Sequence, residues 1–145
     1  RRLGGLLRED GPVALAPQPG LARRDGLVGD VRAAGLPVEV EIEGQPIELP
    51  PGVDLSAFRI VQEALTNALR HAGPTRARVL LRYDDDGLTI DITDDGAGGS
   101  GAPGGGHGLV GIRERVAVYG GDLDAGPRNE GGFAVRARLP IASAR

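Results

Sequence analysis

The chain has 145 residues, of which 25 are glycine and 11 are proline, and its formal net charge is −3. It has no cysteine, which excludes disulfides, iron–sulfur clusters, zinc–cysteine sites and thiol nucleophiles. It also has no lysine, so P-loop and Schiff-base chemistry are excluded because both need that residue. No apolar run approaches the ~18 residues of a membrane span, and no basic stripe indicates a nucleic-acid surface. We therefore expect a cytoplasmic chain with no nucleic-acid partner and no direct membrane contact.

The first half of the chain begins with residues 1–20, which combine leucines at helical spacing with a stretch rich in proline and glycine. We interpret them as the end of a helix followed by a linker. Residues 21–34 favour an amphipathic helix, which Gly35 is expected to stop. Residues 38–43 alternate valine or isoleucine with glutamate, as in a half-buried strand, and residues 47–49 predict a short return strand.

A long helix is predicted from Asp54, a favourable N-cap residue, to about His71. One apolar arc of this helix is expected to lie on a sheet, and its members are Phe58, Val61, Leu65, Ala68 and Leu69. Glu63 and Asn67 fall on the other side, one turn apart. The further members of that side are Ile60, Ala64, Arg70 and His71. Carboxylate and amide oxygens suit Mg²⁺ bound to phosphates, so this side is a candidate site, with a solvated face as the alternative.

The second half of the chain contains a predicted hairpin. Residues 76–83 and 88–93 alternate apolar and polar side chains around an Asp-Asp-Gly turn. After a glycine-rich stretch, residues 109–119 predict a helix, a short strand is expected around Leu123, and residues 133–139 predict the last strand. This order predicts an α/β (α+β) two-layer sandwich, with a mixed, mostly antiparallel sheet and helices on one face.

Two glycine-rich segments add candidate ligand contacts. Asp94 follows the expected strand end, where its carboxylate can accept a hydrogen bond from an exocyclic amine, and Gly96 and Gly98 permit close approach. Residues 104–108 (GGGHG) lead directly into a helix, and the free N–H groups and dipole at a helix N-terminus favour a phosphate. Taken singly, each segment is also compatible with a plain turn or linker.

In combination and in this order, the motifs resemble those of the sensor histidine kinases. Residues 58–72 (FRIVQEALTNALRHA) resemble the N box, closest to the subfamily that partners LuxR-type response regulators. Residues 94–98 (DDGAG) resemble the first glycine box and residues 106–116 (GHGLVGIRERV) the second. The resemblance implies the Bergerat (GHKL) ATPase fold. It assigns residues 1–20 to the end of a dimerisation helix and a linker, and residues 21–145 to the ATP-binding catalytic domain.

The resemblance also implies ATP and Mg²⁺ as cofactors, with a role for each matching residue. Glu63 would be the catalytic residue near the γ-phosphate, Asn67 would bind Mg²⁺ at the ATP phosphates, and Asp94 would read the adenine amino group. The other nucleotide-binding residues implied are Arg70, His71, Gly96, Gly98, Gly106, His107, Gly108, Leu109 and Val110. Residues 99–105 would form the ATP lid, which we expect to be mobile without nucleotide.

The family's phosphoacceptor motif is not present, because neither His71 nor His107 is followed by an acidic residue. The implied reaction is therefore transfer of the ATP γ-phosphoryl to a histidine on a separate dimerisation domain, for relay to a response regulator. We expect the isolated domain to be a monomer and the full protein a homodimer. Residues 131–133 (GGF) depart from the Gly-Thr pair that helps to hold adenine in such ATPases. The alternatives are an anti-sigma-factor-like serine kinase of the same fold and a non-catalytic nucleotide-binding interaction module.

Overall fold

The computed structural model describes residues 20–71, 76–95, 107–129 and 131–141. The side chains of His71, His107 and Gly108 are outside this description. The expected helix end and linker before Gly20 also lie outside the described residues, as does the expected lid at residues 99–105.

The predicted elements are confirmed, with one exception at residues 47–49. In chain order they are the 3₁₀ turn η1 (Leu21–Arg23), α1 (Arg24–Ala33), β1 (Val38–Glu43), α2 (Pro51–His71), β2 (Ala77–Asp84), β3 (Gly87–Asp94), α3 (His107–Val118), β4 (Asp122–Pro127) and β5 (Phe133–Pro140). Within the part of the chain described here, no helix is both long enough and apolar enough to cross a membrane.

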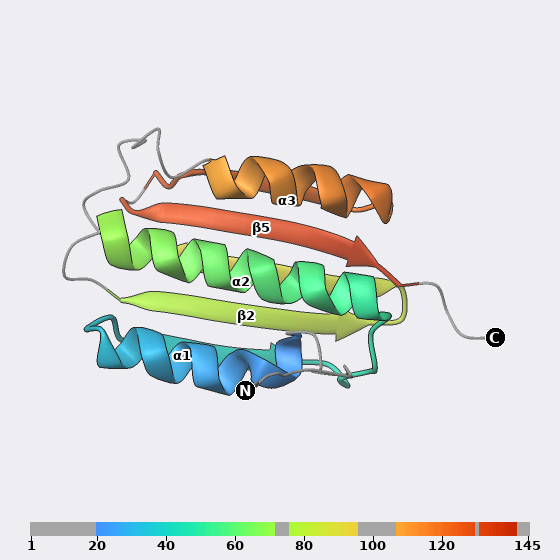
Figure 1. Ribbon diagram of the computed structural model, residues 1–145, viewed down its shortest axis with the longest axis horizontal. Coiled ribbons are helices and arrows are strands. Elements are labelled where there is room, and N and C mark those ends of the chain that lie inside the picture. Colours follow the sequence, from blue (N-terminus) through green and yellow to red (C-terminus); the bar gives the residue numbers. More distant parts are fainter. Residues whose placement is uncertain (1–19, 72–75, 96–106, 130, 142–145) are drawn as a thin grey trace, which may run out of the picture.

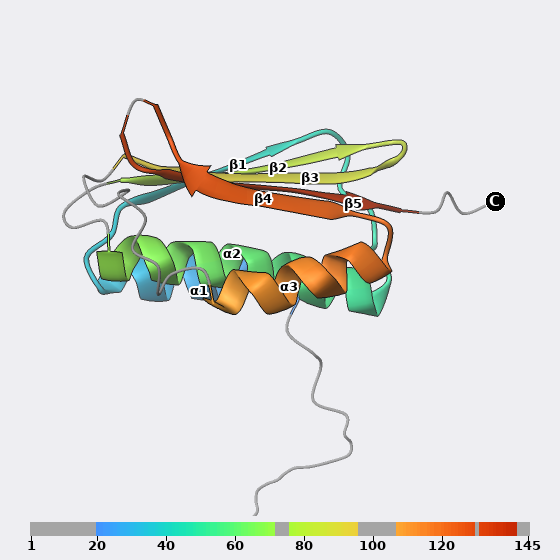
Figure 2. The ribbon, with the colours of Figure 1, turned by 90° about the horizontal axis from the view of Figure 1, so that it is seen from above.

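The five strands form one sheet in the order β1-β2-β3-β5-β4. β1 runs parallel to β2, whereas the β2–β3, β3–β5 and β4–β5 pairs are antiparallel. Figure 2 shows α1, α2 and α3 on the same face of this sheet. The expected two-layer sandwich with a mixed, mostly antiparallel sheet is therefore confirmed.

The strand register puts the apolar side chains of neighbouring strands opposite each other. Ile92 of β3 lies between Val79 of β2 and Val135 of β5, and all three are buried. Because side chains alternate along a strand, a slip of one residue would turn this whole set to solvent. The alternation in the sequence therefore specifies both the strands and the side of the sheet that the helices cover.

Helix α2 lies over the middle of the sheet, between α1 and α3 (Figure 1). Its buried arc is therefore wider than the sequence predicts, and it includes Ile60 and Ala64, which are 0% and 6% exposed. The prediction that Leu69 belongs to the buried arc is wrong, since Leu69 is 36% exposed. Coverage by α1 and α3, in addition to the sheet, explains the burial of Ile60 and Ala64.

Two local predictions before and at the start of α2 are wrong. The helix begins at Pro51, so Asp54 lies inside its first turn and is not its N-cap. A proline is well suited to the first helical position because its missing N–H is not needed there. Asp54 instead accepts a hydrogen bond from the backbone N–H of Leu21, over 2.8 Å. Residues 47–49 form no strand, and among the described strands β1 pairs with β2 alone.

The face of the sheet opposite the helices carries ion pairs between strands. Three of them join paired strands: Glu39–Arg78, Glu43–Arg82 and Asp91–Arg136, at 3.4, 2.9 and 3.8 Å. The fourth, Asp84–Arg138 at 2.9 Å, reaches across β3 from β2 to β5. The opposite charges of each pair neutralise each other, and these charged side chains keep this face in contact with water. A ligand site is therefore expected between the layers and not on this face.

Candidate nucleotide-binding site

Three elements that carry predicted site residues meet at one end of the sandwich. The C-terminal end of α2 and the start of α3 lie toward the same end in Figure 1. Strand β3 also ends there, because it runs antiparallel to β2, which starts at that end. Residues 72–75, which connect α2 to β2, and residues 96–106, which connect β3 to α3, lie outside the described residues. Gly96, Gly98 and Gly106 are among them, so their predicted roles stay predictions.

On α2, Glu63 and Asn67 are both half-buried, and the side-chain oxygen Oδ1 of Asn67 is fully buried. The residues that follow them, Ala64 and Ala68, are buried. An amide oxygen and a carboxylate one helical turn apart therefore lie at the boundary between core and surface. Arg70 is exposed one turn further on, and His71 is the last residue of the helix.

On β3, Asp94 continues the row of core-facing residues formed by Leu88, Ile90 and Ile92. Asp94 is 8% exposed, so the last residue of this buried row carries a carboxylate, whereas the three before it carry apolar side chains. Side chains of aspartate are rarely so buried unless they are bonded or functional. This position faces the helical layer, which is where a ligand between β3 and α2 would present its polar edge.

The backbone around Asp94 is held by residues that the sequence does not single out. The guanidinium of Arg128 donates to the Asp94 carbonyl oxygen over 3.0 Å. The N–H of Asp95 donates to the carbonyl of Arg76 over 3.3 Å, and the Asp95 carboxylate accepts from the Arg76 N–H over 3.0 Å. No motif signals Arg128, because it acts on a backbone atom 34 residues away.

Helix α3 begins at His107, two residues earlier than the sequence predicts. The first four N–H groups of an α-helix have no partner within the helix. In α3 these belong to His107, Gly108, Leu109 and Val110, the residues expected to cradle phosphates. Leu109 is buried and anchors this turn, whereas Val110 is 57% exposed.

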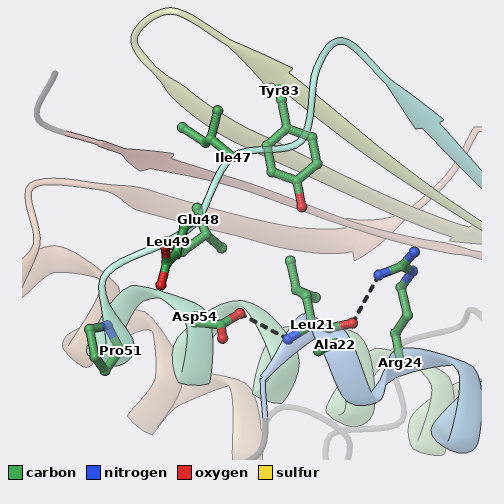
Figure 3. A pocket seen from close by; sticks show the side chains of 9 residues that line it. All are labelled: Leu21, Ala22, Arg24, Ile47, Glu48, Leu49, Pro51, Asp54 and Tyr83. Carbon is green, nitrogen blue, oxygen red and sulfur yellow. Dashed lines mark hydrogen bonds between the residues drawn. The ribbon is translucent and has the colours of Figure 1, made fainter. Parts of the chain in front are cut away.

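A cavity of ≈ 500 Å³ lies at the opposite end of the domain (Figure 3). It is bounded by η1, the start of α1, the β1–α2 connection, the first turn of α2 and the end of β2. Its polar lining residues are Arg24, Glu48, Asp54 and Tyr83. Burial raises the pKa of the Tyr83 hydroxyl; nearby Asp54 raises it further, and Arg24 opposes the shift. The cavity contains none of the predicted site residues, so it is a separate feature.

The donor set at the α2–β3–α3 end fits a nucleotide with its metal ion. Asn67 and Glu63 offer the oxygen ligands that Mg²⁺ prefers, and the buried Asp94 carboxylate is an acceptor for an amine. Among the described residues, no cluster of three or more His, Cys, Asp or Glu could hold a metal by itself. A Mg²⁺ ion held through phosphates needs only one or two protein oxygens.

The chain belongs to the family of histidine kinase-, DNA gyrase B- and HSP90-like ATPases, whose sequence profile matches residues 52–143. It is 36% identical over 124 residues to the sensor histidine kinase YxjM of Bacillus subtilis, covering 84% of this chain and 30% of that protein. It is also 38% identical over 96 residues to the sensor histidine kinase NarS of Mycobacterium tuberculosis, covering 62% of this chain and 22% of that protein. The expectation of a histidine kinase-type ATPase domain is confirmed. The chain spans less than a third of the length of these curated relatives.

Solved structures show the same fold. The mycobacterial sensor histidine kinase MprB aligns with a TM-score of 0.63 at 21% identity, over 86% of this chain and 97% of that one. The histidine kinase domain of the blue-light activated kinase of Erythrobacter litoralis EL346 aligns with a TM-score of 0.62 at 22% identity, over 89% and 66%. These similarities support the fold described above and carry no information on the roles of the site residues.

Proposed function

We propose that the chain is the ATP-binding catalytic domain of a two-component sensor histidine kinase. In this proposal it transfers the γ-phosphoryl of ATP to a histidine on a separate dimerisation domain, for relay to a response regulator of the LuxR type. The observation that carries the proposal is the buried carboxylate of Asp94 at the same end of the sandwich as Glu63, Asn67 and the start of α3.

The proposed roles follow from the chemistry of each group. Asp94 accepts a hydrogen bond from the adenine amino group, and the first turn of α3 binds phosphate through its N–H groups. Asn67 contributes an oxygen to Mg²⁺, which neutralises phosphate charge when it is bound. Glu63 lies one turn before Asn67, where it can orient the acceptor or take its proton. Catalysis rests on positioning and charge neutralisation, as in phosphoryl transfer generally.

The proposed partners belong to the longer protein. They are the dimerisation domain that supplies the phosphoacceptor histidine and the response regulator that receives the phosphoryl group. Sensor histidine kinases among the relatives, including YxjM and NarS, motivate both partners. In this proposal the domain works on the cytoplasmic side, as a monomer by itself and within a homodimer in the full protein.

Calorimetric titration of ATP into this chain, with and without Mg²⁺, tests the nucleotide site. We expect saturable binding that strengthens when Mg²⁺ is added, since Asn67 would help to hold the ion at the phosphates. Tight binding that is indifferent to Mg²⁺ would remove the metal role. Absence of binding in both conditions would contradict the proposal for the domain by itself.

A further inference from the structure

The loop between β4 and β5 closes tightly on itself. The two strands end in the pair Pro127–Phe133. Within the loop, the N–H of Arg128 donates to the carbonyl of Gly132 over 2.9 Å, and the N–H of Gly131 donates to the carbonyl of Arg128 over 3.1 Å. These bonds hold Arg128 and Gly132 together at the base of the loop.

From this position the loop reaches the peptide unit that joins Asp94 to Asp95. The carbonyl oxygen of that unit accepts the 3.0 Å bond from Arg128, and its N–H donates the 3.3 Å bond to the carbonyl of Arg76. A peptide unit is planar, so holding its two polar groups on opposite sides fixes the orientation of the whole plane. The backbone of Asp94 is therefore held between β2 and the β4–β5 loop.

Gly132 makes this approach sterically possible. Its φ is +88°, a value that residues with a side chain rarely adopt. A Cβ at this position would overlap the Asp94 carbonyl oxygen and would lie 2.7 Å from the carbonyl carbon and 2.9 Å from the Asp95 Cα. Any larger residue would push the loop, and the Arg128 side chain with it, away from the peptide.

The direction of a side chain from its backbone is set by the orientation of that backbone. A group that recognises a ligand by a directional hydrogen bond must be held within about 0.5 Å and 10–20° of its working geometry. We propose that Arg128 is a positioning residue for base selection, and that with Gly132 it fixes the Asp94 peptide so that the carboxylate distinguishes adenine from guanine. This inference rests on the proposed function, in which Asp94 reads the base.

The test measures the dissociation constants of ATP and GTP for this chain and its variants. Arg128→Ala is expected to lower the preference for ATP over GTP by ~10-fold, since every 1.4 kcal/mol of hydrogen-bond energy is worth that factor. Arg128→Lys keeps a cationic donor and is expected to retain the preference within ~3-fold. Arg136→Ala is the matched control, because Arg136 lies on the open face of the sheet.

Asp94→Asn separates this inference from the proposed function on which it rests. If Asp94→Asn lowers the preference for ATP and Arg128→Ala does not, the positioning role is wrong and the base-reading role stands. If Asp94→Asn leaves the preference for ATP unchanged, Asp94 does not read the base. The base-reading role of Asp94 and the positioning role of Arg128 are then both wrong.

Amide hydrogen exchange separates a local effect at Asp94 from a general loss of stability, because it compares individual amides within one variant. With Arg128→Ala we expect faster exchange at Asp95 relative to Ile90 in the middle of β3, because one side of the Asp95 peptide is released. Arg128→Lys should return the Asp95 rate toward that of the unmodified chain. Equal acceleration at both amides would mean that Arg128 supports the sheet as a whole, which would overturn the inference.

Discussion

The backbone N–H of Leu21 donates to Asp54 Oδ1 over 2.8 Å, which ties the start of the described chain to the first turn of α2. Leu21 is buried, and its carbonyl accepts a bond from the Arg24 guanidinium over 3.0 Å. Gly20, the residue before Leu21, also lies close to Asp54, since a Cβ on Gly20 would overlap the Asp54 carboxylate. Figure 3 shows the Leu21–Asp54 and Leu21–Arg24 bonds beside the ≈ 500 Å³ cavity.

Replacing Asp54 with alanine is expected to lower the free energy of unfolding by about 1–2 kcal/mol, because a part-buried bond to a charged acceptor is lost. Asp54→Asn keeps an acceptor oxygen and should lose less. Denaturant unfolding measures both, with exposed Asp30 on α1 as the control, where alanine should change stability by less than about 0.5 kcal/mol. An unchanged midpoint for Asp54→Ala would mean that the contact contributes nothing.

The same contact illustrates where sequence reasoning is sufficient and where it is not. Period-two alternation predicts β2, β3 and β5, because their register pairs apolar residues on one face. The role of Asp54 cannot be read locally, since its partner is 33 residues away and becomes adjacent only when η1 packs on α2. The burial of Ile60 and Ala64 is a similar case, because α1 and α3 beside α2 widen its buried arc.

The candidate site shows the same division. The spacing of Glu63 and Asn67 and the strand-end position of Asp94 follow from local sequence. Arg128 does not, because it contacts a backbone oxygen and leaves no motif. The departure from a Gly-Thr pair at residues 131–133 is visible in the sequence, but only the structure shows that Gly132 lies against the Asp94 peptide.

Two glycines with positive φ allow a matched test of steric demand. Gly35 and Gly44 have φ of +113° and +81°, but a Cβ on Gly44 would overlap the Tyr83 carbonyl oxygen, whereas one on Gly35 meets nothing within 4 Å. Gly35→Ala should cost about 1–2 kcal/mol for the backbone conformation alone. Gly44→Ala should cost about 1–3 kcal/mol more because of the clash. If denaturant unfolding shows equal losses of unfolding free energy for the two variants, the loop after β1 can shift to remove the clash without further cost.

The acid sensitivity of the sheet is expected to depend on Asp84. Bonds from Arg138, followed by those from the Asp86 and Gly87 backbone, lower the pKa of Asp84 from 3.8 to about 2. Since the folded-state pKa is lowered, the stabilisation is fully present above the unfolded-state pKa and is lost as the pH falls. The free-energy difference between the unmodified chain and Asp84→Asn should therefore be constant near neutral pH and shrink between about pH 4 and about pH 2. A difference that is independent of pH across this range would contradict the assignment.

Magnesium-dependent nucleotide binding is expected to require Asn67. Asn67→Ala should weaken ATP binding in the presence of Mg²⁺ by ~10-fold or more, as is typical when a group that supports a bound metal is lost. ATP binding without Mg²⁺ should change much less. Gln62→Ala is the control, since Gln62 is an exposed amide on the same helix. Equal weakening with and without Mg²⁺ would assign Asn67 to the nucleotide and not to the metal.

Glu63 is the residue on which the chemical step is expected to depend. Glu63→Gln keeps the size and one oxygen of the side chain but removes its charge and basicity. With a dimerisation domain supplied as acceptor, phosphoryl transfer under single-turnover conditions should slow by ~100-fold or more, the usual contribution of a positioned general base. The dissociation constant of ATP should stay within ~3-fold, because a loss confined to the transition state leaves ground-state binding intact. Glu114→Gln, an exposed change on α3, should leave both quantities unchanged. Transfer by Glu63→Gln at the rate of the unmodified chain would show that positioning by Asn67, Asp94 and the α3 N-terminus suffices without a base.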